Sequence, residues 1–195
     1  MISTVGLLLA AGAGRRMGGP KALLRLHPDG PTRVETGVAQ LLSAGLGRVV
    51  VVVGAGAEQA GPLAEAAGAE VVRAQGWGEG MGASLRAGLT HVRRSEPVPT
   101  SVLVTLVDLP DVDEQVYRRV LRWAGSPAVL ARAAYDGSPG HPVLLGNSHW
   151  DAVLEGAVGD RGARGHLESH DVELVECGDL ATGRDVDTVA DLDGG

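Results

Sequence analysis

Five consecutive valines, at residues 49–53, limit what this chain can fold into more than any other feature. A strand that is covered on one face alternates apolar and polar residues, whereas a strand covered on both faces is apolar at almost every position. Two further apolar runs have the same character, TVGLLLA at residues 4–10 and SVLVTLV at residues 101–107. Buried runs of this kind are typical of parallel sheets with helices packed on both faces.

Segments with helical spacing alternate with these strands along the chain. The pattern predicts helices at residues 33–45, 57–67, 81–94, 112–123, 147–156 and 162–170, and a short helix after Asp187. It predicts strands at residues 4–10, 48–53 and 101–107 and further strands at residues 69–72, 127–133, 141–146 and 172–176, with YDGSPG (135–140) as a turn. This alternation predicts an α/β fold, a three-layer α/β/α sandwich with a mostly parallel, Rossmann-like sheet. The length, without an internal repeat or linker, predicts that residues 1–195 form a single domain.

The charge of the chain is divided unevenly between its two halves. Residues 1–100 contain 10 basic and 7 acidic side chains, whereas residues 101–195 contain 7 basic and 17 acidic ones. The net charge of −7 argues against a protein that grips duplex nucleic acid. With three Trp, two Tyr and no Phe, stacking on single strands is equally unexpected. A cationic first half and an acidic second half suit a small polyanionic ligand together with a metal ion.

No segment of the sequence indicates a membrane or a secreted protein. No stretch reaches the ~18 apolar residues that a spanning helix needs. The segment MISTVGLLLAAGAGRR lacks the charged residues that precede the apolar run of a signal peptide. Cys177 is the only cysteine, which excludes an internal disulfide and a cysteine-based zinc cluster. We therefore expect a cytoplasmic protein without a membrane or nucleic-acid partner.

The loop LAAGAGRRMGGPK, at residues 9–21, follows the first predicted strand. Its four glycines allow backbone N–H groups to turn inward as a nest for phosphate oxygens. Arg15, Arg16 and Lys21 add positive charge, and Lys21 is the only lysine among 17 basic residues. The loop predicts a phosphate site, with a basic glycine-rich turn as the alternative.

Two common phosphate-binding motifs do not fit this sequence. Pro20 interrupts the P-loop pattern, and Met17 stands where a dinucleotide fingerprint has glycine. The segment VVVVVGAGAEQAG, at residues 49–61, also fails as a fingerprint, because Gln59 occupies the third glycine position. We interpret that segment as an ordinary βα turn.

Two carboxylates are candidate metal ligands. Asp108 ends the strand predicted at residues 101–107, at the sheet edge where α/β proteins bind their ligands. Mg²⁺ prefers hard oxygen ligands, commonly one or two carboxylates together with substrate phosphates. Asp187 lies in GRDVDTVADL, where Thr188 and Asp191 also fit a helix cap without any metal. Asp108 could likewise only cap a turn, so both assignments stay open at this point.

Taken together, these segments resemble a known family. The first loop is similar to the signature L-A-A-G-x-G-x-R-M-G-x-x-K of sugar-phosphate and cofactor nucleotidyltransferases, and the segments around Asp108 and Asp187 resemble its metal-binding segments. The segment GEGMGASLRAGL (78–89) resembles the part of the family that runs under the nucleotide base. GHPVLLG (140–146) and GDRGARGHL (159–167) resemble acceptor-side segments of molybdenum cofactor cytidylyltransferases and guanylyltransferases. The resemblance spans nearly the whole chain and implies a sheet of the nucleotidyltransferase type.

The resemblance also implies roles for individual residues. The residues implied to be catalytic are Arg16, Lys21 and Asp108, and those implied to hold Mg²⁺ are Asp108 and Asp187. The residues implied to bind the nucleotide are Leu9, Ala10, Ala11, Gly12, Gly14, Arg16, Lys21, Gly82 and Ser84. The residues implied to bind the acceptor are His141, Asp160 and Arg164. His141 could otherwise be a core histidine at the start of a strand.

These matches imply a Mg²⁺-dependent nucleotidyltransferase. It would transfer CMP or GMP from an NTP to a phosphorylated acceptor and release pyrophosphate, with CTP as the expected donor and GTP as the second. The acceptor resembled is molybdopterin or its molybdenum form, and a molybdoenzyme could receive the product. Leu109 departs from the D-Q-P pattern of the family and Val189 stands where Pro is common, which leaves the acceptor open.

Two other classes of protein remain open at this point. A nicotinamide-dependent oxidoreductase could use the same fold, but it predicts a dinucleotide fingerprint, which both glycine-rich loops lack. A non-catalytic carrier of a cofactor would bind without turnover. The presence of both Asp108 and Asp187 argues against a carrier, because binding alone does not require a metal pair.

Overall fold

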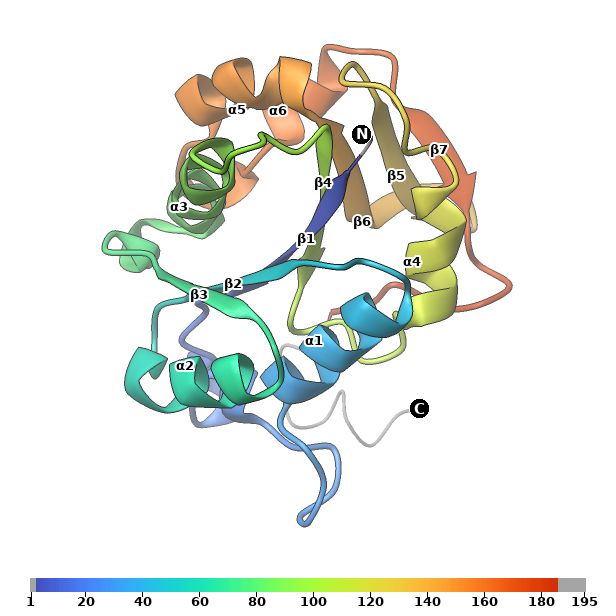
Figure 1. Ribbon diagram of the computed structural model, residues 1–195. Coiled ribbons are helices and arrows are strands. Elements are labelled where there is room, and N and C mark those ends of the chain that lie inside the picture. Colours follow the sequence, from blue (N-terminus) through green and yellow to red (C-terminus); the bar gives the residue numbers. More distant parts are fainter. Residues whose placement is uncertain (1–2, 186–195) are drawn as a thin grey trace.

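A seven-stranded sheet forms the centre of the computed structural model, which describes residues 3–185 (Figure 1). The strand order is β3-β2-β1-β4-β6-β5-β7, and β6 runs antiparallel to both of its neighbours. The other neighbouring strands pair in parallel, which confirms the mostly parallel sheet. The strands are β1 (Thr4–Ala10), β2 (Val49–Val53), β3 (Glu70–Arg73), β4 (Ser101–Leu106), β5 (Leu130–Tyr135), β6 (Ser138–Gly146) and β7 (Glu173–Glu176).

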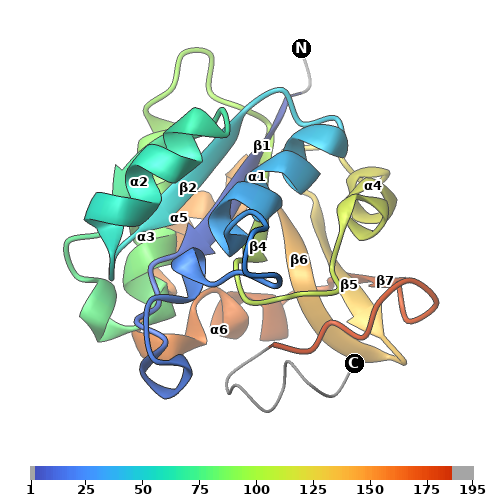
Figure 2. The ribbon, with the colours of Figure 1, turned by 90° about the horizontal axis from the view of Figure 1, so that it is seen from below.

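Helices cover both faces of the sheet, as the alternating pattern predicts (Figures 1 and 2). One face carries α1 (Arg33–Ser43), α2 (Ala57–Ala66) and α4 (Glu114–Leu121), and Figure 2 views the sheet from this side. The other face carries α3 (Met81–Arg93), α5 (Trp150–Gly156) and α6 (Arg164–Glu168). Short 3-10 turns complete the layers: η1 (Arg15–Met17), η2 (Lys21–Leu23), η3 (Trp77–Glu79), η4 (Asn147–His149) and η5 (Gly159–Arg161). No helix in residues 3–185 is long and apolar enough to cross a bilayer.

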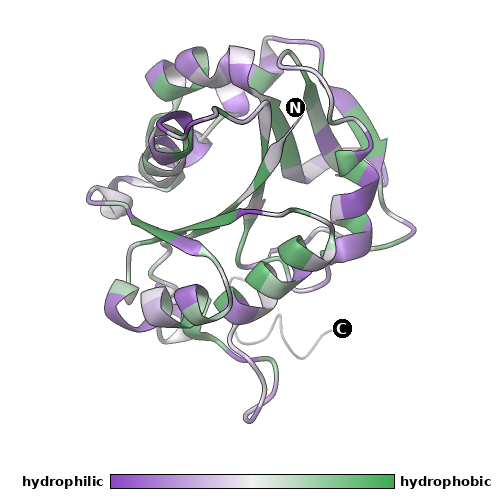
Figure 3. Cartoon of the chain, in the orientation of Figure 1, coloured by the Kyte–Doolittle hydropathy of each residue, from purple (hydrophilic) through white to green (hydrophobic). Residues whose placement is uncertain are grey.

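The central strands supply side chains to two separate cores. Successive side chains of a strand point to opposite faces. Leu8 and Val51 therefore pack with α1, α2 and α4, whereas Leu7 and Val50 pack with α3, α5 and α6. All four side chains are fully buried, and the central strands are coloured largely as hydrophobic in Figure 3. Burial on both faces explains why these strands have no polar alternation.

The hairpin that joins β5 and β6 differs from its predicted boundaries. The sequence predicts strands at residues 127–133 and 141–146, whereas the observed strands extend to Tyr135 and begin at Ser138. The turn consists of Asp136 and Gly137, with φ angles of 51° and 77°, and such two-residue Asp-Gly turns match the twist of paired strands. The six-residue turn predicted at 135–140 was therefore too long. The short helix predicted after Asp187 lies outside the described residues.

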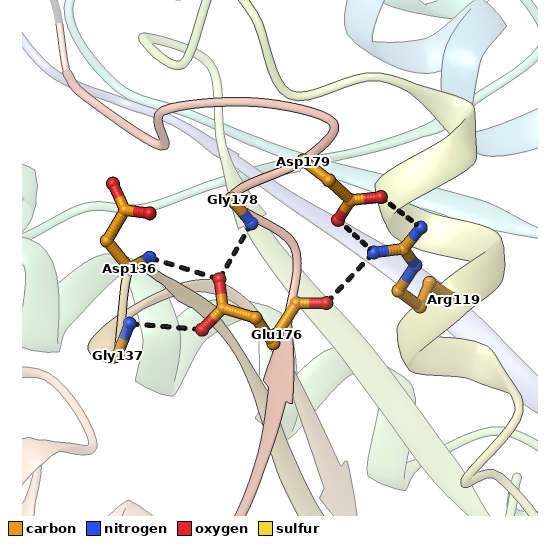
Figure 4. Close-up of polar contacts among 6 residues, drawn as sticks. All are labelled: Arg119, Asp136, Gly137, Glu176, Gly178 and Asp179. Atoms are coloured by element: carbon orange, nitrogen blue, oxygen red, sulfur yellow. Dashed lines mark hydrogen bonds and ion pairs between the residues drawn. The ribbon is translucent and has the colours of Figure 1, made fainter.

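Glu176, at the end of β7, holds this hairpin in place (Figure 4). Its carboxylate accepts hydrogen bonds from the backbone N–H groups of Asp136, Gly137 and Gly178, at donor–acceptor distances of 3.0, 3.0 and 2.8 Å. Arg119 of α4 donates to the carbonyl oxygen of Glu176 at 3.0 Å and pairs with the carboxylate of Asp179. Together these contacts fasten the edge strand and the hairpin to a helix.

Replacing Glu176 with glutamine is expected to lower the thermal unfolding midpoint most clearly at neutral pH. Hydrogen bonds from Gly178, then from Gly137 and Asp136, lower the pKa of Glu176 below its ordinary value of 4.5. A lowered folded-state pKa gives stability that is present above the unfolded pKa and is lost as the pH falls through the folded value. The difference between wild type and Glu176→Gln should thus shrink below about pH 4.5 in thermal melts. Glu173→Gln, on the same exposed strand, is the control, and an equal effect of both variants would contradict this account.

Candidate active site

A cleft of about 630 Å³ opens at the carboxyl ends of β1 and β4. Ligands of parallel α/β sheets bind at this edge, because loops from neighbouring strands meet there. The cleft is lined by the loop after β1, the start of α3, the end of β4 and two further acidic side chains. The residues are Leu9, Ala11, Gly12, Ala13, Gly14, Arg15, Lys21, Trp77, Gly78, Gly80, Met81, Ser84, Leu106, Val107, Asp108, Asp160 and Asp185.

The glycine-rich loop is closed by its own backbone. The carbonyl oxygen of Gly14 accepts hydrogen bonds from the N–H groups of Met17 and Gly19, at 2.8 and 3.3 Å. Gly14 has a φ of 55°, and a Cβ atom there would lie 2.0 Å from the carbonyl oxygen of Gly19. Only glycine fits this position. The tight loop brings Arg15 to the cleft wall and leads the chain directly to Lys21 at the start of η2.

The turn between β2 and α2 braces the glycine-rich loop from the side. Its Ala55 N–H donates to the carbonyl oxygen of Ala11 at 3.0 Å. A Cβ at Gly54 would lie 2.6 Å from Trp77 and 2.8 Å from Ala11, so glycine permits close packing at this point. Within the described residues, the cleft lining includes nothing from this turn. The segment at 49–61 is therefore a strand and a supporting βα turn, as we interpreted it.

Lys21 and Asp108 form the central ion pair of the cleft. The distance from Lys21 Nζ to Asp108 Oδ2 is 2.6 Å, and the two side chains are 15% and 18% exposed. The other carboxylate oxygen of Asp108, Oδ1, is buried and has no hydrogen-bond partner among residues 3–185. A buried oxygen of this kind is costly unless it has a ligand. The carboxylate therefore fits a hard divalent cation, which takes oxygen ligands.

A second cation, Arg33, interacts electrostatically with Asp108 and was not predicted from the sequence. Arg33 begins α1, is only 7% exposed, and its Nη2 atom has no hydrogen-bond partner within the described residues. Burial lowers the pKa of Arg33, and the negative charge of Asp108 opposes this shift. An arginine in the first turn of an amphipathic helix usually extends into solvent, so the sequence contained no signal for its burial.

The chain after β7 brings a further carboxylate, that of Asp185, to the cleft. Asp111 accepts hydrogen bonds from the N–H group and the hydroxyl of Thr182, at 2.6 and 2.7 Å. Gly183 lies so close to the ring of Tyr135 that a Cβ there would be 2.1 Å away. These contacts lead the chain to Asp185, which lines the cleft together with Asp108. Asp187, predicted as the second metal ligand, lies outside the described residues.

A smaller pocket adjoins the cleft and shares Leu9, Met81 and Asp160 with it. The residues predicted to bind the acceptor, His141, Asp160 and Arg164, all line this pocket. The structure adds Arg132 of β5, which donates to the carbonyl oxygen of Gly140 at 3.1 Å. Arg132 is the only charged residue in this strand, and that feature of the sequence could have revealed it.

The pocket contains a neutral histidine together with Arg132 and Arg164. Burial lowers the pKa of His141 to about 4; the positive charge of Arg132 lowers it further, Asp108 acts in the opposite direction, and Arg164 adds a smaller lowering effect. Burial also lowers the pKa of Arg132, and Arg164 contributes to that shift. Two cations beside an uncharged imidazole make a pocket that suits an anionic group.

Three of the residues predicted to bind the nucleotide do not line the cleft. Within the nucleotide set, Ala10 and Gly82 are buried outside the cleft lining, and Arg16 is exposed next to Arg15, which lines the cleft instead. Gly82 allows α3 to approach residues 157–159, since a Cβ there would lie 2.8 Å from the carbonyl oxygen of Ala157. The predicted nucleotide-binding, catalytic and metal residues that do line the cleft are Leu9, Ala11, Gly12, Gly14, Lys21, Ser84 and Asp108, and the predicted acceptor residue Asp160 also lines it.

Comparison with protein families gives one match that spans most of the chain. The family described as "MobA-like NTP transferase domain" matches residues 6–174. This range includes the glycine-rich loop, the Lys21–Asp108 pair and all the residues of the smaller pocket.

Individual relatives cover nearly the whole chain. Nicotine blue oxidoreductase of Paenarthrobacter nicotinovorans is 37% identical over an alignment of 199 positions, which covers 96% of this chain and 93% of that protein. A homologue of Mycobacterium tuberculosis Rv0371c from Mycobacterium sp. strain JC1 has a TM-score of 0.78 at 25% identity, covering 97% of this chain and 93% of that one. Rv0371c of M. tuberculosis H37Rv in complex with manganese has a TM-score of 0.73 at 25% identity, covering 99% and 100%. A nucleotidyl transferase from Methanothermobacter, with a TM-score of 0.76 at 23% identity over 97% and 94% of the chains, has the same fold.

Proposed function

This chain belongs to the MobA-like NTP transferase family, and from that premise we propose that it transfers CMP, or alternatively GMP, from an NTP to a phosphorylated acceptor. Its class is that of a nucleotidyltransferase enzyme, which the family establishes. The proposal concerns the donor base, the acceptor, the metal ion and the residues that act.

The observation that carries the proposal is the Lys21–Asp108 pair inside the cleft. A lysine at the end of a glycine-rich loop supplies a compact, mobile positive charge for phosphate oxygens. An aspartate at the end of the neighbouring strand supplies hard oxygen ligands. Support for the proposal comes from the 2.6 Å contact between these two groups, both of which line the cleft.

The reaction needs no dedicated general base. A phosphate monoester has a second pKa near ~6, so its oxygens are already nucleophilic at neutral pH. One of these oxygens attacks the α-phosphorus of the NTP, and the bond from that phosphorus to the bridging oxygen breaks. The electron pair leaves with pyrophosphate, and a diphosphate linkage remains on the acceptor. The chain contributes by alignment and by neutralising charge.

Each part of the cleft has a distinct task in this proposal. The glycine-rich loop with Arg15, Arg16 and Lys21 holds the triphosphate. Arg132 and Arg164 hold the acceptor phosphate, and the neutral His141 offers a hydrogen bond without adding charge. Ser84 and the start of α3 lie beside the nucleotide, and Asp160 lies where the cleft and the pocket meet.

Mg²⁺ is the metal we propose, held by Asp108 and by acidic groups of the chain after β7, with Asp187 as the second ligand. When bound, such an ion neutralises charge on the phosphate oxygens. The buried Oδ1 of Asp108 supports this assignment. The structural relative Rv0371c forms a complex with manganese, which is also a divalent ion.

The proposed acceptor is molybdopterin or its molybdenum form, with CTP as donor and GTP as the second candidate. A molybdoenzyme would then receive the product in the cytoplasm. These assignments rest on the acceptor-side segments at residues 140–146 and 159–167, which contribute His141, Asp160 and Arg164 to the pocket. We further propose that residues 1–195 act as one domain.

Pyrophosphate release from each of the four NTPs, with Mg²⁺ and with or without a phosphorylated pterin, tests this function. We expect acceptor-dependent release with CTP above the other donors. Asp108→Asn keeps the shape of the side chain but removes its charge, and should lower release by about 10²-fold or more. Asp29→Asn, in an exposed loop, should leave it unchanged. NTP binding without any release would indicate a carrier instead.

A second candidate function is that of an oxidoreductase, because the 37% identical relative is named nicotine blue oxidoreductase. The sequence lacks glycine at the third fingerprint position of both loops, where Met17 and Gln59 stand. Fluorescence titration with NADH and NADPH separates the two candidates. Tight binding of a reduced nicotinamide cofactor, without binding of any NTP, would replace the transferase proposal.

A further inference from the structure

Three histidines gather where the start of α5 meets α6, outside the lining of the cleft and of the smaller pocket. His149 ends η4, His166 lies in α6, and His170 follows that helix. One ring nitrogen of each lies within 4.8 Å of the others. The rings of His166 and His170 stack with their centroids 4.0 Å apart, and both meet His149 edge to face. The roles described above for the cleft and the smaller pocket do not use these side chains.

Backbone carbonyls determine where two of these rings keep their lone pairs. His149 Nε2 lies 3.1 Å from the carbonyl oxygen of Ala128, and a carbonyl only accepts, so Nε2 carries the hydrogen. The neutral ring then keeps its lone pair on Nδ1, which lies 3.0 Å from His166 Nε2. By the same reasoning, His170 donates from Nδ1 to the carbonyl oxygen of His166 at 2.8 Å and keeps its lone pair on Nε2. Metal-ligating histidines are held in this way, with the second ring nitrogen donating to a carbonyl or a carboxylate.

The geometry points to a transition-metal site, and we propose that His149, His166 and His170 bind one Zn²⁺ ion. The ligands are Nδ1 of His149, Nε2 of His166 and a ring nitrogen of His170. Zn–N bonds of about 2.0–2.1 Å in a tetrahedron place two nitrogens about 3.3 Å apart. The observed 3.0 Å between His149 and His166 is within about 0.3 Å of that spacing, and the nitrogen of His170, which lies within 4.8 Å of the other two, must move closer by up to about 1.5 Å. On binding, the hydrogen that His166 shares with His149 moves to Nδ1 of His166.

The surroundings suit zinc better than Mg²⁺. Three imidazoles are borderline-soft nitrogen ligands, which zinc prefers, whereas Mg²⁺ takes oxygen. Burial, followed by the charges of His170 and His149, lowers the pKa of His166, which favours the neutral ring that a metal needs. His170 is exposed, so the fourth position is open to a water molecule. The ion would fasten α6, which carries Arg164 and Leu167 of the smaller pocket, to the start of α5.

Titration of the full chain with ZnCl₂ alone tests the site, with calorimetry for stoichiometry and thermal melts for stabilisation. We expect one ion per chain and a rise of the unfolding midpoint by roughly 5–10 °C at a hundredfold excess over Kd. His166→Gln and His170→Gln should each weaken binding by about tenfold or more. His27→Gln, which removes an exposed histidine elsewhere, should change nothing.

Two further measurements distinguish this site from the carboxylates of the cleft. Asp108→Asn should leave zinc binding unchanged, which keeps the inference independent of the proposed function. Co²⁺ in place of zinc should give the visible absorption of tetrahedral nitrogen coordination, and His149→Gln should remove it. Equal zinc binding by wild type and the triple variant His149→Gln, His166→Gln, His170→Gln would overturn the proposal, as would zinc binding that disappears in Asp108→Asn.

Discussion

The Lys21→Ala variant is expected to release pyrophosphate about 10²–10³-fold more slowly than the wild type. Lys21 is the only lysine of the chain, and its Nζ lies 2.6 Å from Asp108 at the centre of the cleft. Positive charge held in a partly buried cleft stabilises the charge that develops on the phosphates more strongly than it would in water. Alanine removes that charge and leaves the carboxylate of Asp108 without its lysine partner. Steady-state pyrophosphate release with saturating NTP measures the effect.

Two control variants separate loss of catalysis from loss of structure. Lys21→Arg keeps the charge but replaces a point charge with a rigid fork, so we expect only partial activity. Arg94→Ala, which removes an exposed cation after α3, should keep full activity. All three variants should give the circular dichroism spectrum of the wild type. Near-normal release by Lys21→Ala would rule out its assignment to the phosphates.

Replacing Trp150 with alanine is expected to destabilise the fold by about 3–5 kcal/mol. Trp150 begins α5, is 1% exposed and packs in the core between the sheet and α3. Its Nε1–H group also donates to the carbonyl oxygen of Leu145 at 3.1 Å. The substitution therefore leaves a large cavity and a carbonyl without its partner. Thermal melts should show a midpoint lower by roughly 6–20 °C.

Trp123 provides a matched control for this cavity, because it is 48% exposed. Trp123→Ala should change the free energy of unfolding by about 1 kcal/mol or less. Both variants are followed by the same denaturant titration, so their free energies are directly comparable. Equal destabilisation by the two substitutions would mean that burial of Trp150 contributes little to stability.

Local sequence predicted the sheet well where burial is continuous. The strand at residues 4–10 has the predicted bounds, and β2 lies within the valine run, because a strand buried on both faces must be apolar throughout. The hairpin was harder to predict. Its turn depends on two residues with positive φ, Asp136 and Gly137. It also depends on the hydrogen bonds that these residues donate to the carboxylate of Glu176, which is 40 residues away from Asp136.

The candidate site was predictable where one loop carries the signal. The glycine-rich loop and Asp108 were found from their residue types and their positions after strands. Arg33 and Arg132 were not found, because a cation is buried only when distant segments close around it. The histidine cluster has the same origin: His149 and His166 are 17 residues apart, and the packing of α6 on α5 brings them together.

The sequence by itself determined a parallel α/β sheet and a phosphate-type loop, because apolar runs and glycine spacing act over a few residues. Only the tertiary structure decided which charges meet. Lys21 and Asp108 are 87 residues apart, yet their strands are parallel neighbours, so the loops after β1 and β4 leave the sheet at the same edge. The smaller pocket depends on the same kind of arrangement, since β5, β6 and α6 bring Arg132, His141 and Arg164 together. Electrostatic interactions depend on distance in space, and that distance is set by strand order.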